Sequence, residues 1–161
     1  EIPVTNFSTI RDEKIMDETD EKILAKLVEN SRMPISKISA QTGIPDSTVS
    51  NRLKKLEKSN IIDKYTTILN PEELGINVAA IIIIQTETEK HENVEKELPK
   101  LTEVSQVYSV SGEYDILIKL WAHSLDELND IINSKIRTID GIEELRELII
   151  MDVLKEEQLS I

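Results

Sequence analysis

The spacing of the apolar residues changes at Asn70-Pro71, and this change constrains the fold more than any other feature of the sequence. Before it, apolar residues recur every three or four positions, as they do along one side of a helix. After it, residues 78–86 form a continuous and largely β-branched run, which is typical of a strand buried on both faces. The sequence therefore predicts a helical part followed by a part that contains a sheet.

The first predicted helix is TDEKILAKLVEN, at residues 19–30. Either Thr19 or Asp17 can cap its start, because a short polar side chain there accepts a hydrogen bond from the first turn. Its apolar stripe consists of Ile23, Leu24, Leu27 and Val28. Residues 1–16 have no sustained period and are expected to form an arm or extension.

Two further helices flank the sequence QTGIP. The earlier one is short, with Ser36 as its N-cap, Ile38 and the small Ala40 facing inward, and Gly43 as its stop. The later one is expected from about residue 46 to 59, and its inward residues are Val49, Leu53 and Leu56. Two short helices joined by a short turn that contains Gly are the signature of a helix-turn-helix, in which Ala40 would allow the helices to cross closely.

The outward face of the later helix points to DNA. Its side chains are hydrogen-bond donors and none of them is acidic: Ser47, Thr48, Ser50, Asn51, Arg52, Lys54 and Lys55. Short polar groups near the start of such a helix suit base edges, Asn and Arg can contact adenine and guanine in bidentate fashion, and the later lysines suit phosphates. The alternative is an ordinary three-helix bundle, whose solvated face would interleave Glu with Lys as the first helix does.

The net charge of −12 does not argue against this partner. Residues 1–70 contain eleven basic and eleven acidic residues, whereas residues 71–161 contain eight and twenty, so the second part carries the whole imbalance. Because exposed charges are screened beyond about 8 Å, a local basic face matters more for binding phosphate than the total charge.

The remaining elements predict the fold class. The alternating sequence IIDKYTTILN suggests a strand or a two-stranded wing beside the helices. Strands are then expected at 78–86, 104–110, 115–122 and 145–154, with one helix at 91–101 and another that Ser124 caps and that ends before Gly141. The result is an α+β protein, an N-terminal winged helix-turn-helix followed by a C-terminal ferredoxin-like βαββαβ sandwich.

The second part is expected to pair with a copy of itself. Two helices cover only one face of a four-stranded sheet, yet the first and last strands are apolar on both faces, the last at Leu148, Ile149, Ile150 and Met151. A second copy is the nearest apolar partner for the spare face, and a homodimer would present two recognition helices to two half-sites. The expected domains are 17–63 for DNA binding, 64–77 as a linker strand and 78–161 for dimerisation and effector binding.

The composition argues against most enzyme classes. The chain has no Cys and two His, so thiol chemistry, Cys-ligated metals and a multi-histidine centre are not expected, nor is any cofactor or catalytic constellation. Five aromatic residues are too few for a single-stranded nucleic-acid platform. The longest apolar run has seven residues, far short of the roughly 18 that a membrane span needs, so we expect a cytoplasmic protein without a membrane partner.

Three stretches together resemble the Lrp/AsnC family, also called feast/famine regulators. They are DETDEKILAKLVENSRMPISKISAQTGIPDSTVSNRLKKLEKSNIIDKYTTILNPEELG, VSGEYDILIK and IDGIEELRELIIMDVLK. The resemblance covers roughly residues 17–161, and Met16-Asp17 lies where family chains usually begin. It implies transcription regulation, a winged helix-turn-helix, and an αβ domain that forms dimers, often octamers, and commonly binds an amino acid.

The resemblance also implies an effector site at the loop formed by Gly112, Glu113, Tyr114 and Asp115. Glycine backbone N–H groups would meet a carboxylate, and Asp115 would meet an ammonium; the alternative is that SGEYD is simply a turn. Many family members have Thr or Ser after the residue matching Gly141, whereas this chain has the carboxylates Glu143, Glu144 and Glu147. These would disfavour an anionic effector and would suit a basic one, and the other alternative is that the chain binds no effector. Pro45-Asp46 replaces the common Ser-Pro, and Asp46 could cap the recognition helix.

Two other functions stay open on the sequence alone. One is an architectural DNA-binding protein without an effector. The other is an enzyme similar to sirohaem decarboxylases, which have a related two-part fold and position carboxylates with His and Arg. His91, His123, Arg137 and Arg146 are the residues available for that role.

Overall fold

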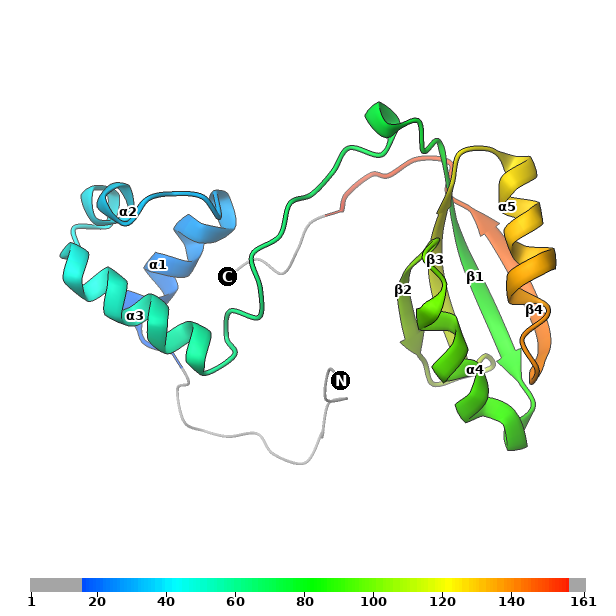
Figure 1. The fold of residues 1–161 in the computed structure, drawn as a ribbon. Helices are drawn as coiled ribbons and strands as arrows, with labels where there is room; N and C mark the ends of the chain where they lie inside the picture. Colours follow the sequence, from blue (N-terminus) through cyan, green and yellow to red (C-terminus); the bar gives the residue numbers. More distant parts are fainter. Residues whose placement is uncertain (1–15, 157–161) are drawn as a thin grey trace. The chain divides into compact units, whose positions relative to one another are not determined.

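The computed structural model describes residues 16–156 in two compact units, one that extends to Ile68 and one formed by Leu69–Glu156 (Figure 1). Each unit is described by itself. Apart from Met16, the predicted arm at 1–16 lies outside the described residues. No helix in the described part of the chain has the length and apolar character needed to cross a membrane.

The first unit contains the three predicted helices, α1 (Glu18–Glu29), α2 (Ile35–Thr42) and α3 (Asp46–Lys58). Asp17 caps α1 by accepting a hydrogen bond from the backbone of Asp20, and the Asp20 side chain accepts one from the backbone of Asp17 in return. The buried apolar side chains that join the helices are Ile23, Met33, Ile38 and Val49.

Four expectations for this unit are wrong. Val28 and Ala40 are exposed, so neither packs between helices. Pro34, not Ser36, precedes α2, and no side chain caps that helix. The stretch 63–70 contains no strand, because no described segment pairs with it and an extended segment needs a hydrogen-bonded neighbour to form a ladder.

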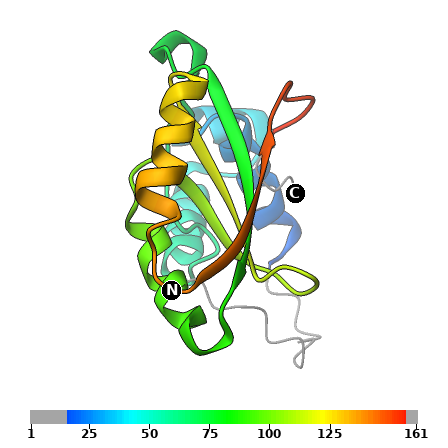
Figure 2. The same ribbon diagram turned by 90° about the vertical axis from the view of Figure 1, so that its right-hand side faces the viewer.

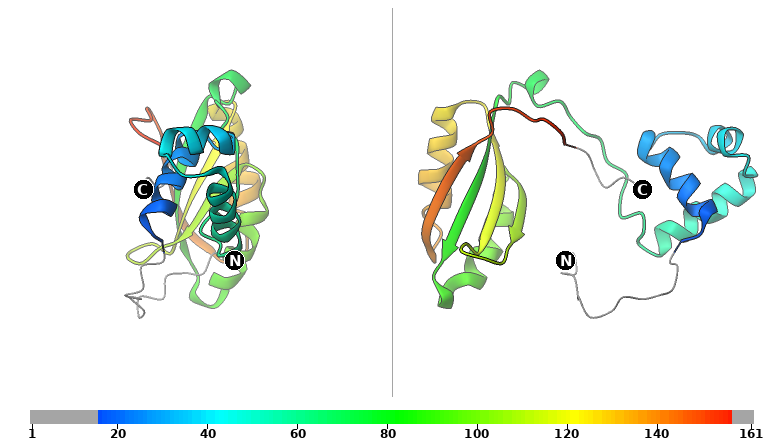
Figure 3. Two further views of the ribbon diagram at one scale, coloured as in Figure 1. Left: turned by 90° about the vertical axis from the view of Figure 1, so that its left-hand side faces the viewer. Right: turned by 180° about the vertical axis from the view of Figure 1, so that it is seen from behind.

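The second unit is the predicted βαββαβ sandwich. Its sheet has the order β2-β3-β1-β4, every neighbouring pair is antiparallel, and its helices lie on one face (Figures 2 and 3). The elements are β1 (Val78–Thr86), α4 (His91–Glu97), β2 (Val104–Ser109), β3 (Ile116–Ala122), α5 (Leu125–Ile131) and β4 (Ile142–Ile149). The structure therefore confirms the predicted fold class except for the wing.

The core lies between the sheet and the two helices. Alternate residues of the central strands are fully buried, such as Ile82 and Ile84 of β1 and Ile118 of β3. Burying each such side chain contributes about 1.5–3 kcal/mol to folding. Gly141 enters β4 with a φ of 107°, and a Cβ there would lie 2.6 Å from the Cβ of Lys90, so only glycine fits.

Three details of this unit differ from expectation. β1 is buried on one face and only half-buried on the other, so it is not a fully buried strand. β4 covers Ile142–Ile149 instead of 145–154, which leaves Met151 exposed after the strand. The helix begins with Ser124 as its cap, as predicted, but Leu125 is exposed, and α5 continues as a wider turn at Ile132–Ile136.

Candidate nucleic-acid interface

The turn between α2 and α3 is built by three consecutive residues. Gly43 ends α2 in the left-handed conformation, with a φ of 73°. Ile44 is half-buried and packs against the core of the helices. Pro45 then precedes the first residue of α3, Asp46, which lies inside the helix and makes no capping bond, so the expectation that it caps α3 is wrong.

The apolar residues of α3 fix which of its faces is exposed. Val49 and Leu56 are fully buried and Leu53 is half-buried against the other helices. The opposite face carries exposed polar residues at helical spacing: Ser47, Asn51, Lys54 and Lys55. Thr48 and Ser50 are half-buried beside them.

These side chains are available to a partner. None of the six, Ser47, Thr48, Ser50, Asn51, Lys54 and Lys55, has a side-chain hydrogen bond or ion pair within residues 16–156. At the start of α3 the face has short polar side chains that can contact base edges, and one to two turns later it has two lysines that can contact phosphates. Its acidic residue, Asp46, lies at the helix start, where its charge is favourable to the helix dipole.

Arg52 does not belong to this face. Its guanidinium Nη1 lies 2.6 Å from Asp17 Oδ2 and 3.3 Å from both carboxylate oxygens of Asp20. Asp20 is only 1% exposed, so Arg52 neutralises a buried charge and ties α3 to the start of α1. This corrects the expectation that the Arg52 side chain projects outward with its neighbours on α3.

A signal for the Arg52 contact is present in the sequence. Asp20 precedes Ile23, Leu24 and Leu27 by three, four and seven positions, so it lies on the inward stripe of α1. A carboxylate on a buried stripe needs a cation nearby. The hydrogen bond from the Asp20 backbone, aided by Arg52, also lowers the pKa of Asp17 below its ordinary value.

The loop at 110–115 shows how the predicted effector residues are arranged. Gly112 has a φ of 143°, and it and Glu113 are exposed. Asp115 instead turns into the domain: its Oδ2 accepts hydrogen bonds from the backbone of Thr86 at 2.8 Å and from the hydroxyl of Thr86 at 3.0 Å. One oxygen of the Asp115 carboxylate is therefore engaged inside the domain.

Tyr114 of the same loop packs beside β4. The Arg146 guanidinium lies 5.3 Å from the centre of the Tyr114 ring, and Arg146 Nε donates to Glu144 at 3.0 Å. The Tyr114 hydroxyl is buried without a hydrogen-bond partner among the described residues. Glu147 pairs with Arg137 at 3.5 Å. Two of the predicted carboxylates beside the loop, Glu144 and Glu147, are thus partly neutralised.

Sequence reasoning missed the hydrogen-bonded chain behind this loop. The Thr86 hydroxyl, which is buried, also lies 2.9 Å from Nδ1 of His91, and Nε2 of His91 lies 3.1 Å from Glu95. This series of hydrogen bonds connects Asp115, through Thr86 of β1, to the first turn of α4. Since Thr86 and Asp115 are 29 residues apart, the only sequence signal was a polar residue at an inward position of β1.

Comparison with protein families gives matches for both units. Residues 16–57 match the AsnC-type helix-turn-helix domain, and residues 79–159 match the Lrp/AsnC ligand binding domain. The chain is also similar to the HTH-type transcriptional regulator FL11 of Pyrococcus furiosus, with 35% identity over 142 residues that cover 88% of this chain and 93% of the relative.

Two solved structures have the same fold. E. coli AsnC superposes with a TM-score of 0.86 at 28% identity, covering 91% of this chain and 99% of AsnC. A transcriptional regulator from Neisseria meningitidis, solved as a complex with L-Met, superposes with a TM-score of 0.86 at 24% identity, covering 91% of this chain and 96% of that one.

Proposed function

This chain belongs to the Lrp/AsnC family of transcriptional regulators, and we propose that it regulates transcription in the cytoplasm by binding duplex DNA in a sequence-specific manner through the exposed face of α3. One observation carries the proposal: Ser47, Asn51, Lys54 and Lys55 form an exposed set of donors without partners in the described part of the chain. Such a set is suited to the major groove, which presents acceptors on bases and phosphates.

The residues divide into two roles. Ser47 and Asn51 lie early in α3 and are assigned to base edges, with Thr48 and Ser50 beside them. Lys54 and Lys55 lie later and are assigned to phosphates. Arg52 acts as a positioning residue, because its guanidinium is engaged by Asp17 and Asp20.

The test is selection of bound duplexes from a random pool with the full chain. We expect recovered sequences to converge on a palindromic site, and wild-type protein to prefer that site over random duplex by about a thousandfold or more. A pool that stays random after repeated rounds, while binding falls steeply with salt, would contradict sequence-specific recognition and favour an architectural role.

We further propose that a small amino acid binds at the loop that contains Gly112 and Glu113. The match of residues 79–159 to a ligand binding domain supports a ligand in this unit, and the Neisseria protein of the same fold was solved as a complex with L-Met. The loop backbone is exposed for a ligand carboxylate, while Glu113 offers a negative charge to an ammonium group. Equilibrium dialysis of the full chain against each of the twenty amino acids tests it, and failure of all twenty would contradict it.

We propose that the helix-free face of the sheet joins two copies into a homodimer, with larger assemblies such as an octamer built from dimers. This face carries Ile81 and Ile83 of β1 and the exposed Leu148 and Tyr108, a patch that water would solvate poorly. A dimer would also supply two α3 helices for a palindromic site. Sedimentation of the full chain as a monomer at micromolar concentration would contradict the dimer.

The histidines favour a regulatory over an enzymatic function. His91 at the start of α4 contacts Glu95 of the same helix, and His123, just before α5, contacts Glu127 in the first turn of α5. These contacts occupy the groups that a decarboxylase of related fold would need for substrate carboxylates. We expect no change in tetrapyrrole absorbance when the protein is titrated with a sirohaem-type compound.

A further inference from the structure

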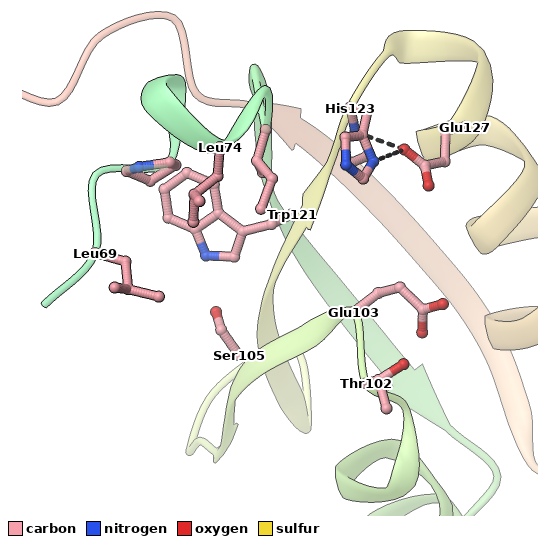
Figure 4. Close-up of a pocket in the computed structure, with 11 residues that line it drawn as sticks. Leu69, Leu74, Thr102, Glu103, Ser105, Trp121, His123 and Glu127 are labelled. Atoms are coloured by element: carbon pink, nitrogen blue, oxygen red, sulfur yellow. Dashed lines mark hydrogen bonds and ion pairs between the residues drawn. The ribbon is translucent and has the colours of Figure 1, made fainter. Parts of the chain in front are cut away.

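The unit Leu69–Glu156 contains a cavity that the proposed function does not use. It has a volume of about 420 Å³ and lies where β3 ends and β2 begins, at the opposite end of β3 from the loop at 110–115 (Figure 4). The segment that precedes β1 closes one side of it through Leu69, Pro71 and Leu74. We refer to it as the corner pocket. Its size is within the range of small-molecule sites.

One side of the corner pocket is apolar and aromatic. Leu69, Leu74 and Trp121 line this side (Figure 4). Leu69 and Leu74 are 63% and 54% exposed, which is costly for leucines unless something covers them. The indole N–H of Trp121 has no hydrogen-bond partner in residues 16–156, and the Ser105 hydroxyl lies on the same side.

The other side is acidic. Glu103 and Glu127 both line it, and both carboxylates are held in place. Glu127 accepts from the backbone of His123 and from its ring Nδ1 at 2.8 Å, and the former contact does most to lower the pKa of Glu127. Lys135 pairs with Glu103 and is the main reason that the pKa of Glu103 is lowered.

The charges on this side do not balance fully. Lys135 offsets one of the two carboxylates, whereas His123 carries a full charge only when it is protonated. The other nearby cation, Lys119, lies 4.8 Å from the centre of the Trp121 ring and pairs with Glu156. A positive group that enters the pocket on the side of Glu103 and Glu127 would therefore meet an excess of negative charge.

We propose that the corner pocket binds a small organic amine, whose apolar or aromatic body lies against Trp121 and Leu74 and whose ammonium group lies near Glu103 and Glu127. An acid of the same shape would meet two carboxylates. A neutral analogue would contact the apolar side but would make no ion pair with Glu103 or Glu127. This site is separate from the loop at 110–115 and would bind its ligand whether or not that loop binds an amino acid.

The test uses the fact that Trp121 is the only tryptophan of the chain. Its fluorescence therefore reports changes around this one side chain, and sedimentation of the same samples separates ligand binding from association of two copies. The full chain is titrated with phenethylamine, 2-phenylethanol and phenylacetate at pH 7, which differ only in the polar end. We expect a saturable change with the amine, binding at least about fivefold weaker with the alcohol, and none with the acid.

Three variants separate charge from shape. Glu103→Gln and Glu127→Gln keep the side-chain size and are each expected to weaken amine binding about fivefold. Leu74→Ala should weaken the amine and the alcohol alike. Glu89→Gln, an exposed change beyond the other end of β1, is the matched control and should leave binding unchanged.

Two results would overturn the proposal. One is equal affinity for amine and alcohol, or unchanged amine affinity in both glutamate variants whose circular dichroism is native. The other is a fluorescence change that depends on protein concentration and follows sedimentation, with no response to amine, because a second copy would then fill the pocket. Neither result bears on DNA binding, which α3 performs in the other unit.

Discussion

Arg52 of α3 and Asp20 of α1 form an ion pair at 3.3 Å, in which the carboxylate is 1% exposed. The pair joins the recognition helix to the N-terminal end of α1, and Asp17 extends it to a third charge at 2.6 Å. A buried carboxylate is tolerated because it is neutralised and hydrogen-bonded. The orientation of α3 against the bundle therefore depends on an electrostatic contact as well as on Val49 and Leu56.

The first prediction concerns this pair. Arg52→Ala leaves Asp20 without its cation, and we expect the free energy of unfolding of the helical unit to fall by about 1–3 kcal/mol. Urea denaturation followed by circular dichroism measures the loss. The double variant Arg52→Ala with Asp20→Asn should recover part of the lost stability, because it has no buried charge without a partner.

Lys55→Ala is the control for Arg52→Ala, since Lys55 is exposed and makes no internal ion pair among the described residues. It should change stability by less than about 0.5 kcal/mol. If Arg52→Ala were as stable as wild type but bound DNA with relaxed base preference, Arg52 would be a reading residue and the positioning role would be wrong.

The second prediction contrasts two residues of the exposed α3 face. Asn51→Ala should reduce discrimination at one base pair by about 1–3 kcal/mol, because an amide can pair with adenine in bidentate fashion. Lys55→Ala should weaken binding to all sequences alike and reduce the slope of log affinity against log salt by about one. Mobility shifts on matched and single-substituted sites, at several salt concentrations, measure both effects.

Lys22→Ala is the matched control for these DNA measurements. Lys22 lies on α1, where it pairs with Glu18, and its removal should leave the salt slope unchanged. Identical effects of Asn51→Ala on every base pair would argue that Asn51 contacts the DNA backbone instead of a base edge.

The elements that the sequence predicted well are those fixed by local pattern. The β-branched run at 78–86 gave the exact bounds of β1, and Gly43 ended α2 as expected. Each depends on neighbours in the chain, so a single sequence carries the information.

The features that the sequence predicted poorly depend on contacts between distant residues. Arg52 was expected to point outward because its neighbours on α3 do. Its side chain instead contacts Asp20, which lies 32 residues away in the sequence. The stretch 63–70 alternates like a strand, but alternation alone does not provide a strand to pair with. Asp115 was expected at the surface of its loop, and its acceptor role for Thr86 follows from the register of β1 with β3.

The third prediction tests that acceptor role. Thr86→Val keeps the side-chain shape but removes the hydroxyl, so Asp115 loses one donor and His91 loses its contact. We expect the free energy of unfolding of the sheet unit to fall by about 1–2 kcal/mol. The same variant should weaken amino-acid binding at the loop, because Thr86 holds Asp115, the last residue of that loop. Thr88→Val, at an exposed position, is the control, and equal denaturation midpoints for the two variants would contradict the prediction.

The fourth prediction concerns acid. The pKa of Asp17 is lowered in the folded protein, chiefly by the hydrogen bond from the Asp20 backbone and also by Arg52. A carboxyl group with a lowered pKa contributes stability above its unfolded value of about 3.9, and this contribution is lost as pH falls through the folded pKa. Asp17→Ser keeps a capping oxygen but carries no charge. We therefore expect wild type to be the more stable of the two at pH 7, and the difference between their urea midpoints to shrink below about pH 4.

Asp63→Ser, an exposed change outside the helices, is the control, and its urea midpoint should not converge with that of wild type in acid. If the difference in urea midpoint between wild type and Asp17→Ser stayed constant from pH 7 to pH 2.5, the prediction would be wrong. The cap would then stabilise α1 through its hydrogen bond alone, and the negative charge of Asp17 beside Arg52 would contribute nothing.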